Sequence, residues 1–161
     1  MKVYKLHYVT RLPIRITEAW EFFSSPGNLP LITPPSMRFE VISEVPPKIY
    51  GGMVALYRLR PMFGIPVQWM TVITNVDEPR LFVDEQRFGP YKLWHHEHFF
   101  REVQGGVEVE DLVYYALHFG VLSRLVNRLL VSKELARVFE FRRKALHDRF
   151  GGDLRADKRL T

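Results

Sequence analysis

The residues of this chain best suited to chemistry are two histidines two positions apart, His96 and His98, within the run Trp94-His95-His96-Glu97-His98. In a β-strand, side chains at positions i and i+2 point to the same face of the sheet. Two imidazoles on one face can bind a metal ion, exchange protons near neutral pH or hydrogen-bond to the polar group of a ligand. Which chemistry applies depends on the neighbouring strands.

Three strand-like runs surround these histidines, at residues 81–87, 92–103 and 107–117. Gly105-Gly106 separates the last two runs and is a hairpin signal, because glycine readily adopts positive φ. If these two glycines form the loop, Gln104 faces Val107. The register then predicts four facing pairs on one side of the sheet: Trp94 with Leu117, His96 with Tyr115, His98 with Val113, and Phe100 with Asp111.

This predicted face mixes large apolar groups with imidazoles, a carboxylate and a phenol, which is typical of the wall of a binding pocket. Asp84 and Gln86 share a face of the preceding strand with Phe82. A three-residue loop at residues 88–90 places Asp84 opposite Trp94 on the pocket side, whereas a two-residue loop turns it away. If Asp84 is buried it needs a partner, since an unpaired buried carboxylate is costly, and we expect Arg58 or a histidine.

Three functional interpretations of the pocket follow from these residues, and a further one is that the histidines are purely structural and only satisfy buried hydrogen bonds. His96 and His98 with Asp111 or Asp84 could ligate zinc or iron. His96 as base and Tyr115 as acid, with Asp111 orienting the imidazole, could catalyse a cyclisation or dehydration. The third interpretation, which we favour, has the histidines hydrogen-bonded to the polar group of a ligand, with no metal and no cofactor. The sequence shows no nucleophile motif and contains no cysteine.

The 161 residues fit one domain, which we assign to residues 1–152, followed by a frayed tail at 153–161. Hydrophobic residues make up 47% of the chain, yet no apolar run approaches the roughly 20 residues of a membrane helix. We therefore expect no stable membrane insertion, and we expect a cytoplasmic protein because cysteine and an N-terminal signal pattern are both missing. No nucleic-acid-binding motif is present.

The order of elements predicts an α+β fold. A strand is followed by two short helices, at residues 19–23 and 28–33, and then by six more strands joined by short turns. The pattern changes to a three- and four-residue spacing of apolar residues over 121–150, which predicts one long amphipathic helix. A curved seven-stranded antiparallel sheet wrapped around this C-terminal helix buries the apolar stripe and leaves a cavity between the two.

This arrangement resembles the helix-grip fold of the SRPBCC superfamily, which includes START domains and birch-pollen-allergen-like proteins. Stretches spread over almost the whole chain are similar to a bacterial, largely uncharacterised ligand-binding branch sometimes labelled as cell-division inhibitors: Pro13-Ile14, Ala19-Trp20-Glu21-Phe22-Phe23, Asn28-Leu29-Pro30, Thr33-Pro34-Pro35, Phe82 with Asp84 and Gln86, Gly89-Pro90, Trp94-His95-His96-Glu97-His98, and Asp111 with Val113, Tyr115 and Leu117. The resemblance implies small apolar ligands, as in lipid carriers and polyketide cyclases.

We therefore expect a carrier or sensor of a small hydrophobic or amphipathic molecule, such as a lipid or a polyketide. The expected ligand-binding residues are Trp94, His96, His98, Phe100, Asp111, Val113, Tyr115, Leu117, Asp84 and Gln86. The alternatives are a cyclase or dehydratase with His96 as base, and an interaction protein that uses the basic segment 120–150, which carries eight basic and three acidic residues. The apolar turn with Met62 and Phe63 is compatible with a homodimer contact.

Overall fold

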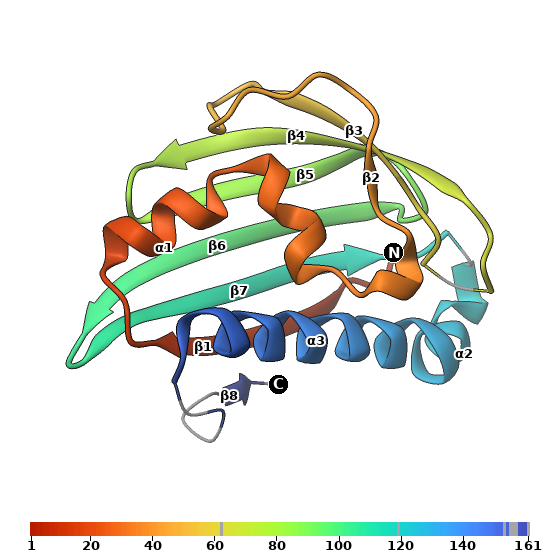
Figure 1. Ribbon diagram of the computed structural model, residues 1–161. Coiled ribbons are helices and arrows are strands. Elements are labelled where there is room, and N and C mark those ends of the chain that lie inside the picture. The colour runs from red at the N-terminus through yellow and green to blue at the C-terminus, as the bar shows by residue number, and fades with distance from the viewer. Residues whose placement is uncertain (62, 119, 153, 155–157, 161) are drawn as a thin grey trace.

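The computed structural model describes residues 1–61, 63–118, 120–152, 154 and 158–160. These residues form one antiparallel sheet of eight strands, covered on one face by helical segments (Figure 1). The strands lie in the order β2-β3-β4-β5-β6-β7-β1-β8. Their bounds are β1 Tyr4–Leu12, β2 Glu40–Val41, β3 Val54–Leu59, β4 Val67–Asp77, β5 Leu81–Phe88, β6 Leu93–Val103, β7 Gly106–Ala116 and β8 Lys158–Leu160.

An eighth strand lies within the tail 153–161, of which the structure describes residues 154 and 158–160. β8 pairs antiparallel with β1, so that Lys158 lies opposite Val9 and Leu160 opposite His7. Through this pairing, residues 158–160 cover the edge of β1 that β7 leaves open. The seven strands predicted from the sequence are all present, and β8 is added at this edge.

The helical segments also follow the predicted order. After β1 come α1 (Ile16–Phe23) and two 3-10 segments, η1 (Pro26–Ile32) and η2 (Pro35–Met37). The predicted long helix is present but changes its winding along its length. It begins with η3 (Gly120–Leu122), continues through α2 (Ser123–Val126) and the π-helical η4 (Asn127–Val131), and ends with α3 (Ser132–Phe150). The curved sheet with its long C-terminal helix confirms the helix-grip fold.

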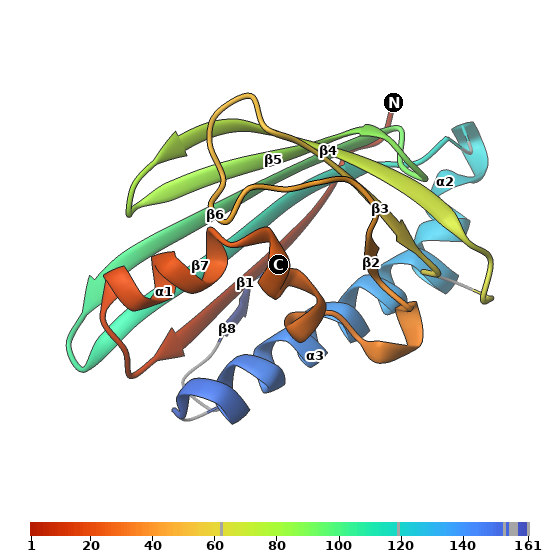
Figure 2. The ribbon, with the colours of Figure 1, turned by 45° about the horizontal axis from the view of Figure 1, so that its top comes forward.

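Figures 1 and 2 show α1 and α3 on the same face of the curved sheet. Every second residue of each strand points toward the helices. The apolar residues among them pack against the apolar stripe of α3, whose residues recur every three or four positions. Trp20 of α1 packs edge-on against Phe82 and Phe100, with ring centroids 6.0 and 5.5 Å away. This aromatic cluster belongs to a hydrophobic core that also contains Leu146 of α3.

The register of the β6–β7 hairpin differs from the prediction by two residues. Trp94 lies opposite Tyr115, His96 opposite Val113, His98 opposite Asp111, and Phe100 opposite Val109. Val103 pairs with Gly106, so the loop is Gln104-Gly105 rather than Gly105-Gly106. A shift of two preserves the face, and all the predicted residues still point to the same side.

The physical reason for this register lies in the different roles of the two glycines. Gly105 has φ +84° and supplies the turn. Gly106 belongs to β7, where a Cβ atom would lie 2.0 Å from the carbonyl oxygen of Leu12 in the neighbouring strand. Gly106 is therefore required by the close approach of β1 and not by the hairpin loop.

The β5–β6 pairing places Asp84 opposite His96 and Phe82 opposite His98. With the three-residue loop, Trp94 was expected to lie opposite Asp84. This register is wrong by two residues, because the connection between the strands is longer than either loop that we considered. The shift is again even, so Asp84 does face the helix side of the sheet, as the three-residue loop predicted.

Candidate functional site

A cavity of about 180 Å³ lies between the concave face of the sheet, helix α3 and the segment that contains η1 and η2. Its floor consists of side chains from β3 to β6, including Tyr57, Trp69 and Trp94. Helix α3 contributes Leu135 and Phe139, together with three further residues. Most of the lining is apolar, so the cavity favours a hydrophobic occupant.

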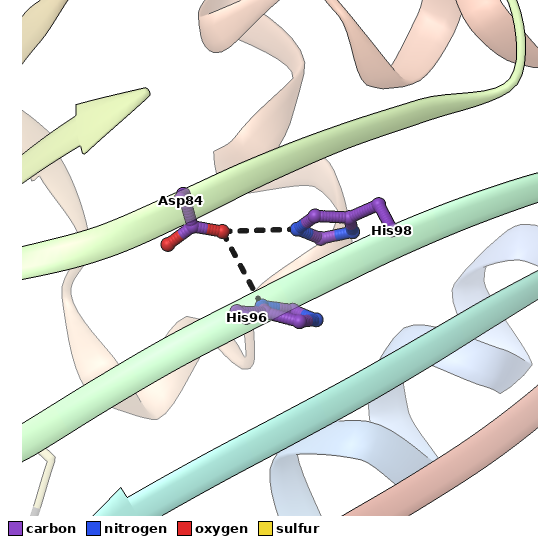
Figure 3. A group of neighbouring side chains, drawn as sticks. All are labelled: Asp84, His96 and His98. Carbon is purple, nitrogen blue, oxygen red and sulfur yellow. Dashed lines mark hydrogen bonds and ion pairs between the residues drawn. The ribbon is translucent and has the colours of Figure 1, made fainter. Parts of the chain in front are cut away.

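Among the polar residues of the cavity wall, three side chains from neighbouring strands lie together, Asp84 of β5 and His96 and His98 of β6 (Figure 3). The Oδ2 atom of Asp84 lies 3.0 Å from Nε2 of His98 and 3.4 Å from Nδ1 of His96. The two imidazoles are stacked obliquely, with ring centroids 3.7 Å apart. Phe82 stacks on the other side of His98 at 4.0 Å, which fixes the plane of that ring.

A second carboxylate, Asp111 of β7, lies behind the histidines and is almost fully buried. Its Oδ1 atom is 2.9 Å from His96 Nε2 and 3.1 Å from His98 Nδ1. Arg142 of α3 donates from Nη1 to the same oxygen at 3.0 Å. Asp111 therefore holds His96 by a hydrogen bond, lies against His98 and ties the sheet to the C-terminal helix.

Burial and charge set the protonation of this cluster. Burial opposes ionisation of Asp111, but the guanidinium of Arg142 and the two imidazoles hold its pKa well below its usual value. The pKa of Asp84 is also lowered, because its hydrogen bond with His98 and the charges around it outweigh the effect of burial. Both carboxylates are thus ionised at neutral pH.

The two histidines differ from each other. Burial, followed by the charge of His98, lowers the pKa of His96 to about 4, so His96 is neutral at pH 7. Burial also acts to lower the pKa of His98, but its contacts with Asp111 and Asp84 outweigh that effect and raise the pKa. One imidazole of the pair therefore carries a proton more readily than the other, although both lie side by side.

Of the ten predicted site residues, all within the described part of the chain, four line the cavity: Asp84, Trp94, His96 and His98. The other six are placed elsewhere. Asp111 lies behind the histidines, and Phe100 belongs to the aromatic cluster with Trp20. Val113 and Leu117 are buried in the core against α3, while Tyr115 donates its hydroxyl hydrogen to Asn127 Oδ1 at 2.8 Å.

Gln86 has a structural role in the turn after β5. Its side-chain nitrogen donates to the carbonyl oxygen of Tyr91 at 2.7 Å, and its side-chain oxygen accepts the Tyr91 N–H at 3.2 Å. The amide is thereby used by the backbone of the turn, which holds the Tyr91 ring in the cavity wall.

The main residue that we did not predict is Arg142. It occupies a position of the apolar stripe formed by Leu135, Phe139 and Leu146, and this signal is visible in the sequence because a cation on such a stripe requires a buried partner. For Asp84 we predicted either Arg58 or a histidine as partner. The histidines contact it, whereas Arg58 forms an exposed pair with Glu40.

The basic character of the C-terminal helix is partly neutralised by neighbouring acids. Arg137 pairs with Glu134, Arg143 pairs with Glu140, and Arg142 is directed inward. At the apolar turn between β3 and β4, Met62 lies outside the described residues, and the side chain of Phe63 is 79% exposed. In the described part of the chain, no helix is both long and apolar enough to cross a membrane.

Comparisons with known proteins agree with the fold. No protein-family model and no curated protein matches the sequence. Among solved structures, TTHA0849 from Thermus thermophilus is similar with a TM-score of 0.66 and 18% identity, covering 91% of this chain and 97% of that one. Protein Ms6760 from Mycobacterium smegmatis is similar with a TM-score of 0.64 and 18% identity, covering 92% and 98%.

A third similar structure is Ara h 8.0201, with a TM-score of 0.59 and 11% identity over 91% of this chain and 99% of that one. At these identities the likeness shows the fold alone. It supports the helix-grip architecture, and the membership in SRPBCC and its bacterial branch that the resemblance implies stays a prediction.

Proposed function

We propose that this protein binds a compact, mainly hydrophobic molecule that carries one polar group. The observation behind the proposal is the cavity itself: apolar walls with buried polar side chains gathered at one edge, which is the usual make-up of a small-molecule site. The apolar walls supply affinity, and the edge formed by Asp84, His96, His98 and Arg142 orients the polar group.

The volume limits the size of the ligand. About 180 Å³ is close to the roughly 150 Å³ of a protein cavity that takes up benzene, and it is below the ~300–1,000 Å³ typical of larger ligand sites. A small aromatic or short-chain molecule fits this space better than a long-chain lipid. The proposal therefore narrows the lipid or polyketide that we expected from the sequence.

The polar edge favours a hydroxyl or a similar group that can both donate and accept. Asp84 is an ionised acceptor, whereas Arg142 and His98 carry donors. A hydroxyl placed between them can donate to the carboxylate while it accepts from a cation. Such a bond contributes about 0.5–1.5 kcal/mol, so a ligand with the hydroxyl should bind roughly 2- to 12-fold more tightly than its hydrocarbon analogue.

The test is a titration with 2-naphthol and with naphthalene, followed by the fluorescence of Trp69 and Trp94 in the cavity wall. We expect saturable binding of both, with 2-naphthol the tighter. The variant Val138→Trp places an indole in the cavity from α3 and should abolish binding. Lys144→Trp, an exposed position on the same helix, is the matched control and should bind like the wild type.

Absence of saturable binding to the wild type, or equal binding by Val138→Trp, would contradict the proposal. Circular dichroism of each variant separates a blocked cavity from a fold that has not formed. Because the two tryptophan substitutions lie on one helix and differ in whether they face the cavity, an effect confined to residue 138 identifies the cavity as the site.

A further inference from the structure

We propose that Asp84, His96 and His98 form a binding site for a divalent first-row metal ion such as Zn²⁺ or Fe²⁺, which faces the cavity. Each of the three residues offers one ligand atom, and the three atoms lie within 4.8 Å of one another (Figure 3). The inference adds to the proposed function, because the metal is placed at the polar edge of the same cavity, and it revises our expectation that no metal is bound.

The distances fit a metal ion at the centre of the group. Zinc binds imidazole nitrogen and carboxylate oxygen at about 2.0–2.2 Å, so two ligand atoms of a tetrahedral site lie roughly 3.3 Å apart. Asp84 Oδ2 lies 3.4 Å from His96 Nδ1 and 3.0 Å from His98 Nε2. Two nitrogens and one carboxylate oxygen are a ligand set used for both zinc and non-haem iron.

Asp111 supplies the outer contact that metal-binding histidines require. Ligating imidazoles usually donate their other ring N–H to a carboxylate, which fixes the tautomer and the orientation of the ring. His96 Nε2 is hydrogen-bonded to Asp111 Oδ1 at 2.9 Å, which leaves Nδ1 with its lone pair directed toward Asp84. The same carboxylate oxygen is held by Arg142 and also lies 3.1 Å from His98 Nδ1, within reach of a proton on that nitrogen.

Two atoms of the cluster support the proposal because metal binding would satisfy both. His96 Nδ1 lies 3.4 Å from the carboxylate of Asp84, so two acceptors face each other. His98 Nδ1 is buried 3.1 Å from Asp111 Oδ1, yet it has no hydrogen-bond partner among the described residues. A cation between Asp84 and the rings would separate the two acceptors, Asp84 and His96 Nδ1. If His98 bound the metal through Nε2, its proton would be on Nδ1, where it could be donated to Asp111 Oδ1.

The charges of the cluster indicate which ligands a metal would recruit. With both imidazoles neutral, Asp84 and Asp111 outweigh Arg142 by one negative charge, so a divalent cation leaves one positive charge. A phenolate or carboxylate oxygen in the open coordination position would neutralise it. Since all three metal ligands line the cavity, a compact molecule with an ionisable oxygen is the ligand class that this site fits.

The experiment is a calorimetric titration of EDTA-treated, dialysed protein with Zn²⁺, and a parallel titration with Co²⁺ followed by its visible absorption. We expect one equivalent of metal and the absorption of a low-symmetry Co²⁺ site with nitrogen ligands. Asp84→Asn should abolish stoichiometric uptake. Asp111→Asn keeps all three ligands but loses the carboxylate behind the histidines, so its affinity should fall roughly 10- to 100-fold.

The matched control is His95→Ala. His95 lies on the opposite face of β6, where it contacts Glu85 and Glu97, and its removal should leave uptake unchanged. Failure of the folded wild type to take up one equivalent would overturn the proposal, as would uptake that survives Asp84→Asn and disappears in His95→Ala. Metal uptake is measured without any organic ligand, and naphthol binding is measured in EDTA, so each proposal can fail while the other stands.

Discussion

The ion pair between Arg142 and Asp111 gives the sharpest prediction for stability. It joins α3 to β7 across the edge of the cavity, and its side chains are only 11% and 3% exposed, with Nη1 and Oδ1 3.0 Å apart. In Arg142→Met, the methionine fills part of the space, but Asp111 stays buried with only the imidazoles as partners. Removing one member of a buried pair costs about 3–5 kcal/mol, because the remaining charge is uncompensated.

The matched control is Arg137→Met on the same helix. Arg137 also pairs with a carboxylate, Glu134, but its side chain is 47% exposed. Exposed ion pairs contribute about 0.2–1 kcal/mol to stability. The loss in free energy of unfolding should therefore be several-fold larger for Arg142→Met than for Arg137→Met, although both variants remove an arginine from α3. For a protein of this size, the loss in Arg142→Met corresponds to a fall in melting temperature of roughly 10 °C.

The assay is urea unfolding at pH 7 in EDTA, followed by tryptophan fluorescence, with the free energy taken at equal slope for all variants. The double variant Asp111→Asn/Arg142→Met should lose less stability than the sum of its single variants, since the two side chains share one interaction. An Arg142→Met variant that loses less than about 1 kcal/mol, or no more than Arg137→Met, would refute the role we assign to this pair.

Three further predictions concern pH and packing. The free energy of unfolding in EDTA should fall by up to roughly 3 kcal/mol as the pH drops from 6.5 to about 4, because in that range His96 is protonated in the unfolded chain while burial holds its pKa in the folded protein at about 4. Urea unfolding at a series of pH values measures this fall, and His96→Gln should make stability depend less on pH. Gly106→Ala should lower the free energy of unfolding by about 2–3 kcal/mol, since its Cβ would lie 2.0 Å from the Leu12 carbonyl oxygen. The control Gly105→Ala, whose Cβ meets no atom but which keeps φ +84°, should lower it by about 1 kcal/mol. Equal losses of stability in the two variants would contradict the close approach of β1 to Gly106. Trp20→Ala should cost about 3–5 kcal/mol by thermal unfolding, because the indole is almost fully buried against two phenylalanine rings, and a loss below about 1 kcal/mol would count against this packing.

The side chains of β6 and β7 that share one face of the sheet were predictable from the sequence, whereas the register of the strands was not. Side chains alternate with a period of two, so an even error moves a residue along the sheet without turning it over. That is why His96 and His98 were assigned correctly to the cavity side although the β6–β7 register was wrong by two. The face of Asp84 depended on the length of the β5–β6 loop, which the sequence left open. The error arose at Gly106, whose close contact with β1 is a tertiary constraint that the local sequence does not reveal.

The alternation of side chains along a strand does not tell whether a residue lies at the surface of the cavity or behind it. Asp111 shares a face with the histidines but lies behind them, because Arg142 reaches it from a helix whose rotation about the sheet the sequence does not specify. The other wall of the cavity comes from η1, η2 and nearby loops, where no periodic pattern marks the inward residues. Leu29 and Met37 are examples, and both appear in the sequence only as apolar residues near prolines.

The central claim, that the cavity binds a compact ligand, can be tested most directly through the three tryptophan indole N–H signals in a ¹⁵N-correlated NMR spectrum. Trp69 and Trp94 line the cavity, whereas Trp20 packs in the aromatic core outside it. Addition of 2-naphthol should shift the signals of Trp69 and Trp94 in a saturable manner and leave that of Trp20 in place. No shift at saturating naphthol, or a shift confined to Trp20, would contradict the account.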